Sequence, residues 1–459
     1  MEAFEAEQLL KKQRDFFHSG KTLPVAYRKE ALLKLRKAIL TYEEELCKAL
    51  YADLGKSKSE SYMTEIGLVL GEISHMLKHV KSYARERHIR TAMVNAVARS
   101  FEKPTPYGNV LIMSPWNYPV LLALDPLVDA LSAGNTVILK PSAYSPATTA
   151  VLKKMLSETF DDEYVSVVTG GRAENASLLN LPVNYIFFTG SQTVGREVIK
   201  CSAKGLVPCT LELGGKSPAI VDETANIPLA AKRIVFGKLL NCGQTCVAVD
   251  YVYCHERVKD RFIEEVIKQI KLQYGENPLE NENYGKIINE KHFQRLKGLI
   301  DESKLVYGGE TEEEKCRIAP TIMDGITRED AIMQEEIFGP IMPVLTFSDL
   351  KEVVCEMQNL PTPLACYIFS SDKNNIELVK SHTNFGGGCV NDTIVHMPLS
   401  DMGFGGVGES GMGTYHGKRG FETFSHIKSM VDKKTFLDLP IRYQPYSTLK
   451  DKIIRMFVR

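Results

Sequence analysis

A cysteine in a turn of small and polar residues is the first candidate for chemistry in this chain. Cys246 follows Gly243, Gln244 and Thr245, so the turn would present its thiol. A thiolate is a far better nucleophile than a thiol, and a helix N-terminus or a nearby positive charge would favour it. Backbone N–H groups of such a turn could also face an oxyanion. A buried structural cysteine gives the same pattern, so Cys246 needs partners before it indicates nucleophilic catalysis.

Two polar residues elsewhere in the chain could be those partners. Glu212 lies beside a Gly-Gly turn in the segment 211–218 (LELGGKSP), where a carboxylate can swing and act as a general base. Asn117, in the segment 114–119 (SPWNYP), follows an apolar strand, and its amide can donate to a developing oxyanion. Taken alone, Glu212 is equally well explained as a surface or ion-paired glutamate, and Trp116 beside Asn117 as a core residue.

A strand–turn–helix pattern at residues 187–195 (FFTGSQTVG) resembles a phosphate-binding turn. The strand ends at Gly190 and Ser191, and Gly195 falls in the first helical turn, so N–H groups and the helix dipole would face an anion. The glycines are five apart, so the pattern is not GxGxxG and an ordinary strand–helix turn also explains it. Lys140 follows a strand too, and could reach a ribose hydroxyl or a phosphate, or be solvated.

A carboxylate and an aromatic ring come together in the segment 335–340 (EEIFGP). Glu336 could accept hydrogen bonds from ribose hydroxyls while Phe338 lies against a ring, which would make a nucleotide contact; a surface turn is the alternative. Residues 403–417 are dense in glycine, so the backbone there must turn tightly or approach something closely, unless it is a flexible loop.

These residues lie among elements that alternate between strand and helix. The first hundred residues show helical spacing of apolar side chains, and a strand or ribbon is expected over 88–103. Short apolar runs predict parallel strands at 110–113, 136–139, 165–168 and 185–188, with helices near 121–133, 146–158 and 193–203. A second set has strands at 219–221, 249–253, 343–346 and 367–370 and helices at 229–240 and 258–273. The pattern predicts a doubly wound α/β fold with a domain boundary near 205–211.

Composition narrows the class of protein. The 459 residues carry 56 basic and 57 acidic side chains, a net charge of −1, so no nucleic-acid partner is expected. No apolar run reaches the ~18 residues of a spanning helix, and the acidic N-terminus is no secretory signal. Ten scattered cysteines favour a reducing compartment, so we expect a cytoplasmic protein. We expect no metal site, because there is no CxxC pair and the HxxxH of His75 and His79 is interpreted as a helix face.

Together these segments resemble the aldehyde dehydrogenase superfamily from about residue 20 to about residue 430. LELGGKSP, with Cys246 lying 34 residues after Glu212, is very specific, and GMGTYHGKRGFETFSH indicates the class 3 branch, which includes the fatty and aromatic aldehyde dehydrogenases. The resemblance implies an aldehyde dehydrogenase fold: a Rossmann-like cofactor domain, an α/β catalytic domain and a small bridging β element for oligomerisation. It also implies a homodimer.

The resemblance divides the chain into four parts. These are an NAD(P)-binding domain at 1–85 and 105–209, the bridging element at 86–104 and 418–445, a catalytic domain at 210–417, and a C-terminal tail at 446–459. The tail could be a membrane-surface helix or a lid over the substrate mouth, and packing on the partner subunit is favoured over both.

The resemblance also implies a mechanism. Cys246 would form a thiohemiacetal with the aldehyde, and Asn117 with the Cys246 backbone N–H would form the oxyanion hole. Loss of hydride to the nicotinamide would leave a thioester, and Glu212 would activate the water that hydrolyses it. Tyr118 and Met397 would line the substrate tunnel, although core packing explains them equally well.

Cofactor contacts are implied in the same way. Glu336 would hold the nicotinamide ribose, Phe338 would pack near the nicotinamide, Lys140 would reach the adenosine ribose, and Gly190, Ser191 and Gly195 would flank the pyrophosphate. The superfamily often has KPSE, whose Glu binds the ribose hydroxyls and disfavours a 2′-phosphate, whereas this chain has Ala143 there. NAD or NADP is therefore expected as cofactor, with NADP accepted.

The main expectation is a dehydrogenase that oxidises medium- or long-chain aliphatic or aromatic aldehydes to carboxylates. Three questions stay open beside it. A CoA-acylating enzyme is the first, although a retained Glu212 favours hydrolysis. A structural, crystallin-like protein that keeps the fold is the second. The third concerns Cys242, which could form a disulfide with Cys246 under oxidation or only pack.

Overall fold

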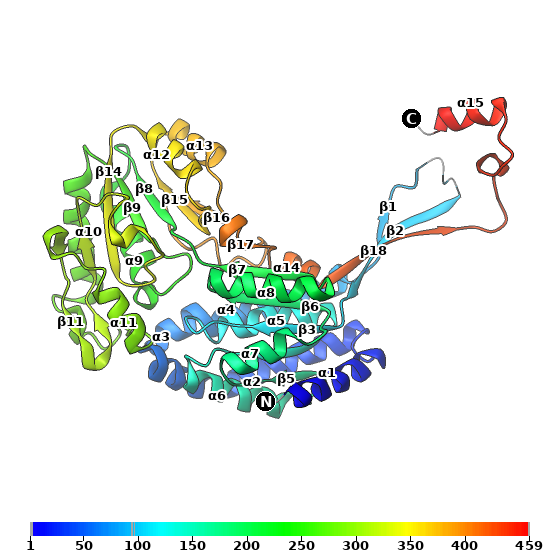
Figure 1. Ribbon diagram of the computed structural model, residues 1–459, viewed down its shortest axis with the longest axis horizontal. Coiled ribbons are helices and arrows are strands. Elements are labelled where there is room, and N and C mark those ends of the chain that lie inside the picture. Colours follow the sequence, from blue (N-terminus) through cyan, green and yellow to red (C-terminus); the bar gives the residue numbers. More distant parts are fainter. Residues whose placement is uncertain (1–2, 93–94, 96, 458–459) are drawn as a thin grey trace.

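The computed structural model describes residues 3–92, 95 and 97–457. The chain forms two lobes, each built on its own sheet, and a narrow three-stranded sheet that projects from the body (Figure 1). The expected α/β architecture with a small separate β element is confirmed. The strand expected over 88–103 is found as two strands, and its residues 93, 94 and 96 lie outside the described residues.

Helices at the N-terminus pack on the first lobe. They are α1 (Ala3–His18), α2 (Val25–Leu54), the short α3 (Lys58–Ser61), a π-helical turn η1 (Tyr62–Ile66) and α4 (Gly67–Tyr83). The helical spacing predicted this region, since Leu32, Leu35 and Ile39 are all fully buried on one face of α2. Gly55 ends α2 in a left-handed conformation (φ 68°), which glycine adopts at no steric cost.

The first sheet has the order β17–β7–β6–β3–β4–β5. Its strands are β3 (Asn109–Met113), β4 (Thr136–Lys140), β5 (Val165–Val167), β6 (Tyr185–Gly190), β7 (Cys209–Leu213) and β17 (Gly411–Met412). The connecting helices are α5 (Leu121–Ala133), α6 (Pro146–Thr159), α7 (Arg172–Leu179) and α8 (Gln192–Gly205). All neighbours pair in parallel except β17 with β7, and every residue of β3 and β4 is buried, which is why these strands appear in the sequence as unbroken apolar runs.

The second sheet has the order β10–β13–β14–β9–β8–β15–β16. Its strands are β8 (Pro218–Val221), β9 (Tyr251–His255), β10 (Leu305–Tyr307), β13 (Thr321–Met323), β14 (Ile341–Phe347), β15 (Ala365–Phe369) and β16 (Gly387–Val390). Its helices are α9 (Ile227–Leu239), α10 (Lys259–Tyr274), α11 (Glu290–Lys297), α12 (Leu350–Gln358) and α13 (Lys373–His382). A hairpin of β11 (Thr311–Glu312) and β12 (Arg317–Ile318) lies outside this sheet.

One boundary differs from the expectation. β7 crosses the break expected near 205–211 and pairs in parallel with β6, so the chain passes to the second lobe only after Leu213. Polar Thr210 and Glu212 interrupt the apolar run of this strand. Both side chains are nevertheless buried, which the sequence pattern does not reveal.

The projecting sheet joins segments from distant parts of the chain. It has the order β1 (Arg87–Ile89), β2 (Ala98–Pro106) and β18 (Ser425–Lys433), and β18 follows the short helix α14 (Gly417–Thr423). The C-terminal helix α15 (Thr448–Phe457) lies beyond the end of this sheet, away from both lobes (Figure 1). Among the described residues, no helix has the length and apolar character needed to cross a membrane.

Arg28 of α2 fastens the N-terminal helices to the first lobe. It is 6% exposed, and its guanidinium donates to the carbonyls of Thr22 (3.0 Å), Leu23 (2.8 Å) and Ser132 (3.2 Å). We expect Arg28→Met to lower the free energy of unfolding by about 3 kcal/mol, because three buried carbonyls lose their donors. Urea denaturation followed by fluorescence measures this change.

Arg36, exposed on the same helix, is the matched control. Arg36→Met should change the free energy of unfolding by less than about 0.5 kcal/mol. Equal effects of the two substitutions would mean that the carbonyl contacts of Arg28 contribute nothing specific.

Candidate active site

A cavity of about 840 Å³ collects residues from both lobes. Nine residues singled out from the sequence line it: Asn117, Tyr118, Gly190, Ser191, Glu212, Cys246, Glu336, Phe338 and Met397. Lys140 and Gly195 are not among its lining residues. Trp116, interpreted from the sequence as a core residue, instead lines the cavity, with its ring 5.4 Å from that of Phe338 and perpendicular to it.

The backbone before Cys246 is held in an uncommon conformation. Asn241, Cys242 and Gly243 are consecutive residues with φ of 53°, 53° and 74°. Non-glycine residues rarely adopt positive φ, and each such position costs roughly 1–3 kcal/mol unless the surroundings impose it. The chain leaves α9 through this turn, and Cys246 follows at the cavity wall.

The fully buried side chain of Gln244 holds that turn in place. Its amide nitrogen donates to the carbonyls of Asn241 (3.1 Å) and Lys286 (3.0 Å), and its oxygen accepts from the N–H of Ile288 (3.0 Å). Glu60 accepts from the Asn241 N–H at 2.8 Å. These four hydrogen bonds fix the strained segment and so the position of Cys246.

Two glycines allow the segment 335–340 to approach the other motifs. A Cβ at Gly243 would lie 2.3 Å from the Gly339 carbonyl oxygen, and one at Gly214 would lie 2.1 Å from Glu336 Oε2. No other residue type fits at either contact without displacing backbone or carboxylate. The glycines of the NCGQTC and LELGG segments therefore serve the meeting of loops from different elements.

Burial sets the protonation state of Cys246. Desolvation raises the pKa of the thiol to about 12, and the negative charges of Glu336 and Glu212 add to the effect. This differs from the positive surroundings that would favour a thiolate. In the form that the structure describes, the thiol is protonated at neutral pH.

Glu212 is a buried carboxyl group that receives no hydrogen bond from the described residues. It is 3% exposed at the end of β7, and neither of its oxygens has a partner in that part of the chain. Burial raises its pKa well above the ordinary value. A carboxyl in this condition can take up a proton from a molecule that enters the cavity.

Asn117 is held against the cysteine turn from both ends. Its side-chain amide donates to the Gln244 carbonyl at 3.0 Å, and its own carbonyl accepts from Asn241 Nδ2 at 2.8 Å and Lys56 Nζ at 2.9 Å. The next residue, Tyr118, shares a hydrogen bond of 2.6 Å with Thr245, the residue before Cys246. The segments that carry Asn117 and Cys246 therefore move as one unit.

An ion pair that the sequence analysis missed positions this unit. Lys56 and Glu65 are 0% exposed and lie 2.6 Å apart. Glu65 also accepts from the N–H groups of Val120 (2.8 Å) and Leu121 (3.2 Å), so it caps the start of α5. In the sequence both residues look like charges on a solvated helix, and only the π-helical turn η1, which no local pattern indicates, brings Glu65 inward.

The segment 335–340 is fixed by its own charged contacts. Asp250 accepts from the Ile337 N–H at 2.8 Å and pairs with Lys216 at 2.6 Å, while Arg295 pairs with Glu335 at 3.0 Å. Burial and the charge of Asp250 raise the pKa of Glu336 to about 8. The Glu336 carboxyl thus sits between protonated and charged forms near neutral pH.

The end of the first sheet carries features suited to a phosphate-bearing ligand. Ser191 caps the start of α8. The first N–H groups of that helix therefore lie next to Gly190, the last residue of β6. Lys140 ends β4 almost fully buried, its ammonium donating to the Pro141 carbonyl at 2.9 Å, and burial lowers its pKa. Ala143 nearby is exposed. Gly195 faces inward, since a Cβ there would lie 2.9 Å from a Leu213 methyl group.

Cys242 and Met397 have different surroundings. Cys242 belongs to the apolar core of the second lobe, and a Cβ on Gly285 would lie 3.3 Å from its sulfur. Cys242 does not line the cavity as Cys246 does, which favours packing over a disulfide between them. Met397 is partly buried and lines the cavity.

Comparison with known proteins gives consistent matches over the whole chain. A sequence model described as "Aldehyde dehydrogenase family" matches residues 1–430. The 4,4'-diaponeurosporen-aldehyde dehydrogenase of Staphylococcus aureus is 45% identical over 99% of this chain and 99% of its own. Aldehyde dehydrogenase family 3 member H1 of Arabidopsis thaliana is 40% identical over 99% of this chain and 95% of its own.

Solved structures agree with the sequence relatives. The substrate-bound state of Staphylococcus aureus AldH has a TM-score of 0.97 at 45% identity, with 99% of each chain covered. An indole-3-acetaldehyde dehydrogenase of P. syringae in complex with NAD+ has a TM-score of 0.86 at 26% identity, covering 94% of this chain and 89% of its own.

A further structural neighbour was solved with the other nicotinamide cofactor. The glyceraldehyde-3-phosphate dehydrogenase GapN of Methanocaldococcus jannaschii, complexed with NADP, has a TM-score of 0.85 at 26% identity over 95% of each chain. The family therefore includes binders of both cofactors. With the family model, the relatives and the fold in agreement, this chain belongs to the aldehyde dehydrogenase family and is an oxidoreductase that acts on aldehydes.

Proposed function

We propose that the chain oxidises medium- or long-chain aliphatic or aromatic aldehydes to carboxylates with NAD or NADP. The observation that carries the proposal is the convergence of Cys246, Glu212 and Asn117 on one cavity, which Ser191 and Glu336 also line. A structural protein has no need of a strained turn that presents a thiol to a buried carboxyl group.

Cys246 attacks the aldehyde carbon in the first step of the proposed mechanism. Its proton must leave, and Glu212 in its ionised form is the nearby carboxylate with free oxygens to receive it. The aldehyde oxygen becomes the oxyanion of a thiohemiacetal. Asn117 Nδ2, which donates to the Gln244 carbonyl in this structure, and the Cys246 N–H are the donors proposed for it.

Glu212 acts again in the second half of the reaction. When the thiohemiacetal has lost hydride, Cys246 holds a thioester. Glu212, once it has released the first proton to solvent, removes a proton from the water that attacks the thioester. The lack of protein donors to the Glu212 oxygens leaves them free to bind that water. Hydrolysis releases the carboxylate and returns the thiol.

The residues present fit a nicotinamide dinucleotide. Lys140 is a buried cation with no acidic partner at hydrogen-bond distance among the described residues, and the start of α8 presents N–H groups for a pyrophosphate. Glu336 would accept from ribose hydroxyls, and Phe338 would limit the ring's movement, with Gly190 and Gly195 beside the pyrophosphate. Once bound, the cofactor accepts the hydride. The exposed Ala143 supports acceptance of a 2′-phosphate.

An apolar aldehyde suits the remaining wall of the cavity. Beside Tyr118 and Met397, the lining residues include Leu121, Leu122 and Phe404. The relative from Staphylococcus aureus is named a 4,4'-diaponeurosporen-aldehyde dehydrogenase, which supports an aldehyde as the substrate here.

A homodimer is part of the same proposal. The strand β16 is an open edge of the second sheet, and the projecting sheet of β1, β2 and β18 stands clear of the body (Figure 1). Such edges are suited to pairing between copies of the chain. The proposal takes residues 1–85 and 105–209, together with the rest of β7, as the cofactor domain. The expected catalytic domain of 210–417 then begins after Leu213, and 446–459 are a tail that packs on the partner.

The catalytic assignment predicts distinct losses for two variants. Cys246→Ala should lower kcat/KM at least about 10³-fold, because no nucleophile remains. Glu212→Gln should keep a single burst of reduced cofactor but slow steady turnover about 10²–10⁴-fold, because the thioester persists. Since the pKa of Glu212 is raised, the wild-type rate should rise with pH from neutral to alkaline, and the Gln variant should lose this rise.

Stopped-flow and steady-state measurements of reduced nicotinamide test these outcomes over acetaldehyde to decanal and benzaldehyde, with and without CoA. Turnover that requires CoA would favour the acylating enzyme. Absence of turnover with any aldehyde, despite cofactor binding, would contradict the dehydrogenase and favour a structural protein.

Cofactor choice is tested at residue 143. Ala143→Glu should lower kcat/KM for NADP relative to NAD by about 10-fold or more, because a carboxylate would repel the 2′-phosphate. Ala143→Gln has the same size without the charge and should shift the ratio much less. An unchanged ratio in the Glu variant would remove the electrostatic explanation.

The buried ion pair is predicted to control the position of Asn117. Lys56→Met leaves Glu65 charged and unpaired, so we expect a loss of about 3–5 kcal/mol of stability. A fall in kcat larger than any change in KM should accompany it. Lys58→Met is the control, since Lys58 is 67% exposed and pairs with Glu44 at the surface. An unchanged kcat in a folded Lys56→Met variant would show that the ion pair does not affect catalysis.

A further inference from the structure

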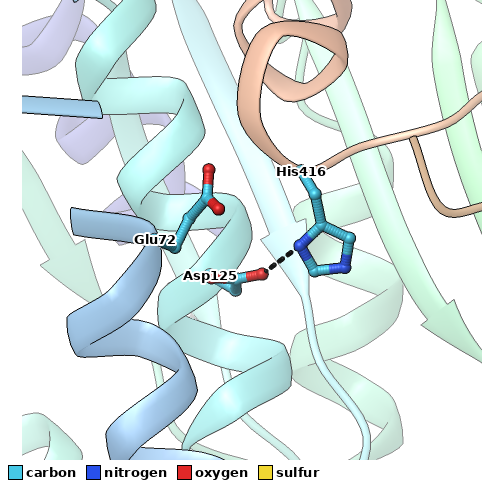
Figure 2. Close-up of side chains that lie close together, drawn as sticks. All are labelled: Glu72, Asp125 and His416. Atoms are coloured by element: carbon cyan, nitrogen blue, oxygen red, sulfur yellow. Dashed lines mark ion pairs between the residues drawn. The ribbon is translucent and has the colours of Figure 1, made fainter. Parts of the chain in front are cut away.

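A second group of buried ionisable side chains lies behind the cavity wall. Glu72 of α4, Asp125 of α5 and His416, just before α14, offer ligand atoms that all lie within 4.8 Å of one another. Figure 2 shows the three side chains pointing toward one another from three separate elements. A second residue of α5, Asp129, adjoins them, since it accepts from the His416 N–H at 3.3 Å.

The group has more negative charge than its surroundings balance. Glu72, Asp125 and Asp129 are 2%, 1% and 0% exposed. Within the described ranges, no lysine or arginine forms an ion pair with any of them, and the one basic group in contact is His416, whose Nδ1 lies 2.7 Å from Asp125 Oδ2. Even with His416 protonated, two buried carboxylates lack a counter-charge.

Several carboxylate oxygens also lack hydrogen-bond donors. Apart from the contact of Asp125 Oδ2 with His416 Nδ1, neither oxygen of Asp125 and not Oδ1 of Asp129 has a hydrogen-bond partner among the described residues. Glu72 has more hydrogen-bond donors around it. Its Oε1 accepts from the Gly417 N–H at 2.7 Å, and Ser400 lies beside the carboxyl group. Ionised carboxylates only accept, so they cannot satisfy one another.

We propose that Glu72, Asp125 and His416, with Asp129 beside them, bind a divalent transition-metal ion at this buried position. Ligands about 2.1 Å from a metal lie about 3–4 Å from one another. The ligand atoms here lie within 4.8 Å of one another, so small side-chain shifts that open the 2.7 Å contact between His416 Nδ1 and Asp125 Oδ2 would admit one ion. Three carboxylates and one imidazole favour ions that accept both oxygen and nitrogen, such as Mn²⁺ or Zn²⁺. His416 would bind through Nδ1. The sequence had led us to expect no metal site, since these ligands have no motif spacing.

The ion would act on the structure of the active-site wall. His416 stacks on Tyr415, with ring centroids 4.0 Å apart, and Tyr415 lines the cavity that Cys246 lines. Asp125 lies on α5, the helix that follows Asn117. A bound cation would therefore join α4, α5 and the glycine-rich segment 403–417 behind the site. This role goes beyond the proposed reaction and does not depend on it.

Raised pKa values of the acidic groups are the alternative that the test must separate. Burial raises the pKa of Glu72, and burial together with Glu72 and Asp125 raises that of Asp129 well above its ordinary value. Protons could then take the place of a cation. In that case the folded state binds more protons than the unfolded chain, so stability would fall as pH rises through neutrality.

Metal binding is measured on the full-length protein without an activity assay. The protein is stripped with EDTA, dialysed and titrated with Mn²⁺, and the free ion is counted by its paramagnetic resonance signal. We expect one Mn²⁺ per chain and a rise in Tm of about 3 °C or more at saturating Mn²⁺. Asp125→Asn should lose the bound ion and the rise in Tm.

Two controls make the result specific. Asp125→Asn removes a buried charge and keeps the shape of the side chain, so the metal-free variant should be at least as stable as the wild type. Asp401→Asn changes a carboxylate whose side chain is 95% exposed and should bind Mn²⁺ like the wild type. Equal binding by Asp125→Asn and the wild type, or no bound Mn²⁺ and no Tm shift in the wild type at pH 8, would overturn the proposal in favour of protons.

Discussion

The buried pair of Lys56 and Glu65 is the interaction on which the geometry of the candidate site depends. Both charges are fully removed from water, so each is tolerated only because of the other and of the backbone groups around them. Lys56 holds the Asn117 carbonyl, and Glu65 holds the first N–H groups of α5. Removing either charge would leave the other unpaired in the interior. The pair therefore fixes the start of α5 and the position of the Asn117 backbone beside Gln244.

A series of direct contacts connects this ion pair to the other residues of the site. Gln244 connects Asn117 to the strained turn before Cys246, and Gly243 in that turn lies against the segment that carries Glu336. Gly214 lets the Glu336 carboxylate approach the strand end of Glu212. Three consecutive positive φ values persist because neighbouring side chains impose them. The glycines of these motifs are therefore needed for the close approach of the two lobes, and not for backbone flexibility.

The sequence predicted those parts of the molecule that depend on local patterns. The buried strands β3, β4 and β6 appear as apolar runs, and the residues at or just beyond their carboxyl ends are Asn117, Lys140 and Ser191, as parallel sheets require. The boundary expected near 205–211 falls within β7, where Thr210 and Glu212 interrupt the apolar run. Lys56, Glu65 and Asp125 could not be found, since a charged residue in a helix pattern looks solvated until tertiary packing buries it. The raised pKa of Cys246 could not be predicted either, because it results from burial in the folded protein and not from residues adjacent in the sequence.

Burial of the thiol lowers the reactivity of the proposed nucleophile when no substrate is bound. Reactivity toward oxidants follows the thiolate fraction, and with a pKa of about 12 only a very small fraction of Cys246 is ionised at neutral pH. The same burial raises the pKa of Glu212, so burial opposes the charged forms of both the base and the nucleophile. Binding of an aldehyde would change that balance, because negative charge then develops on its oxygen beside Asn117, whose side chain lines the cavity. Activation is thereby tied to occupancy of the site, and protection of Cys246 does not require a disulfide with Cys242, which packs in the core of the second lobe.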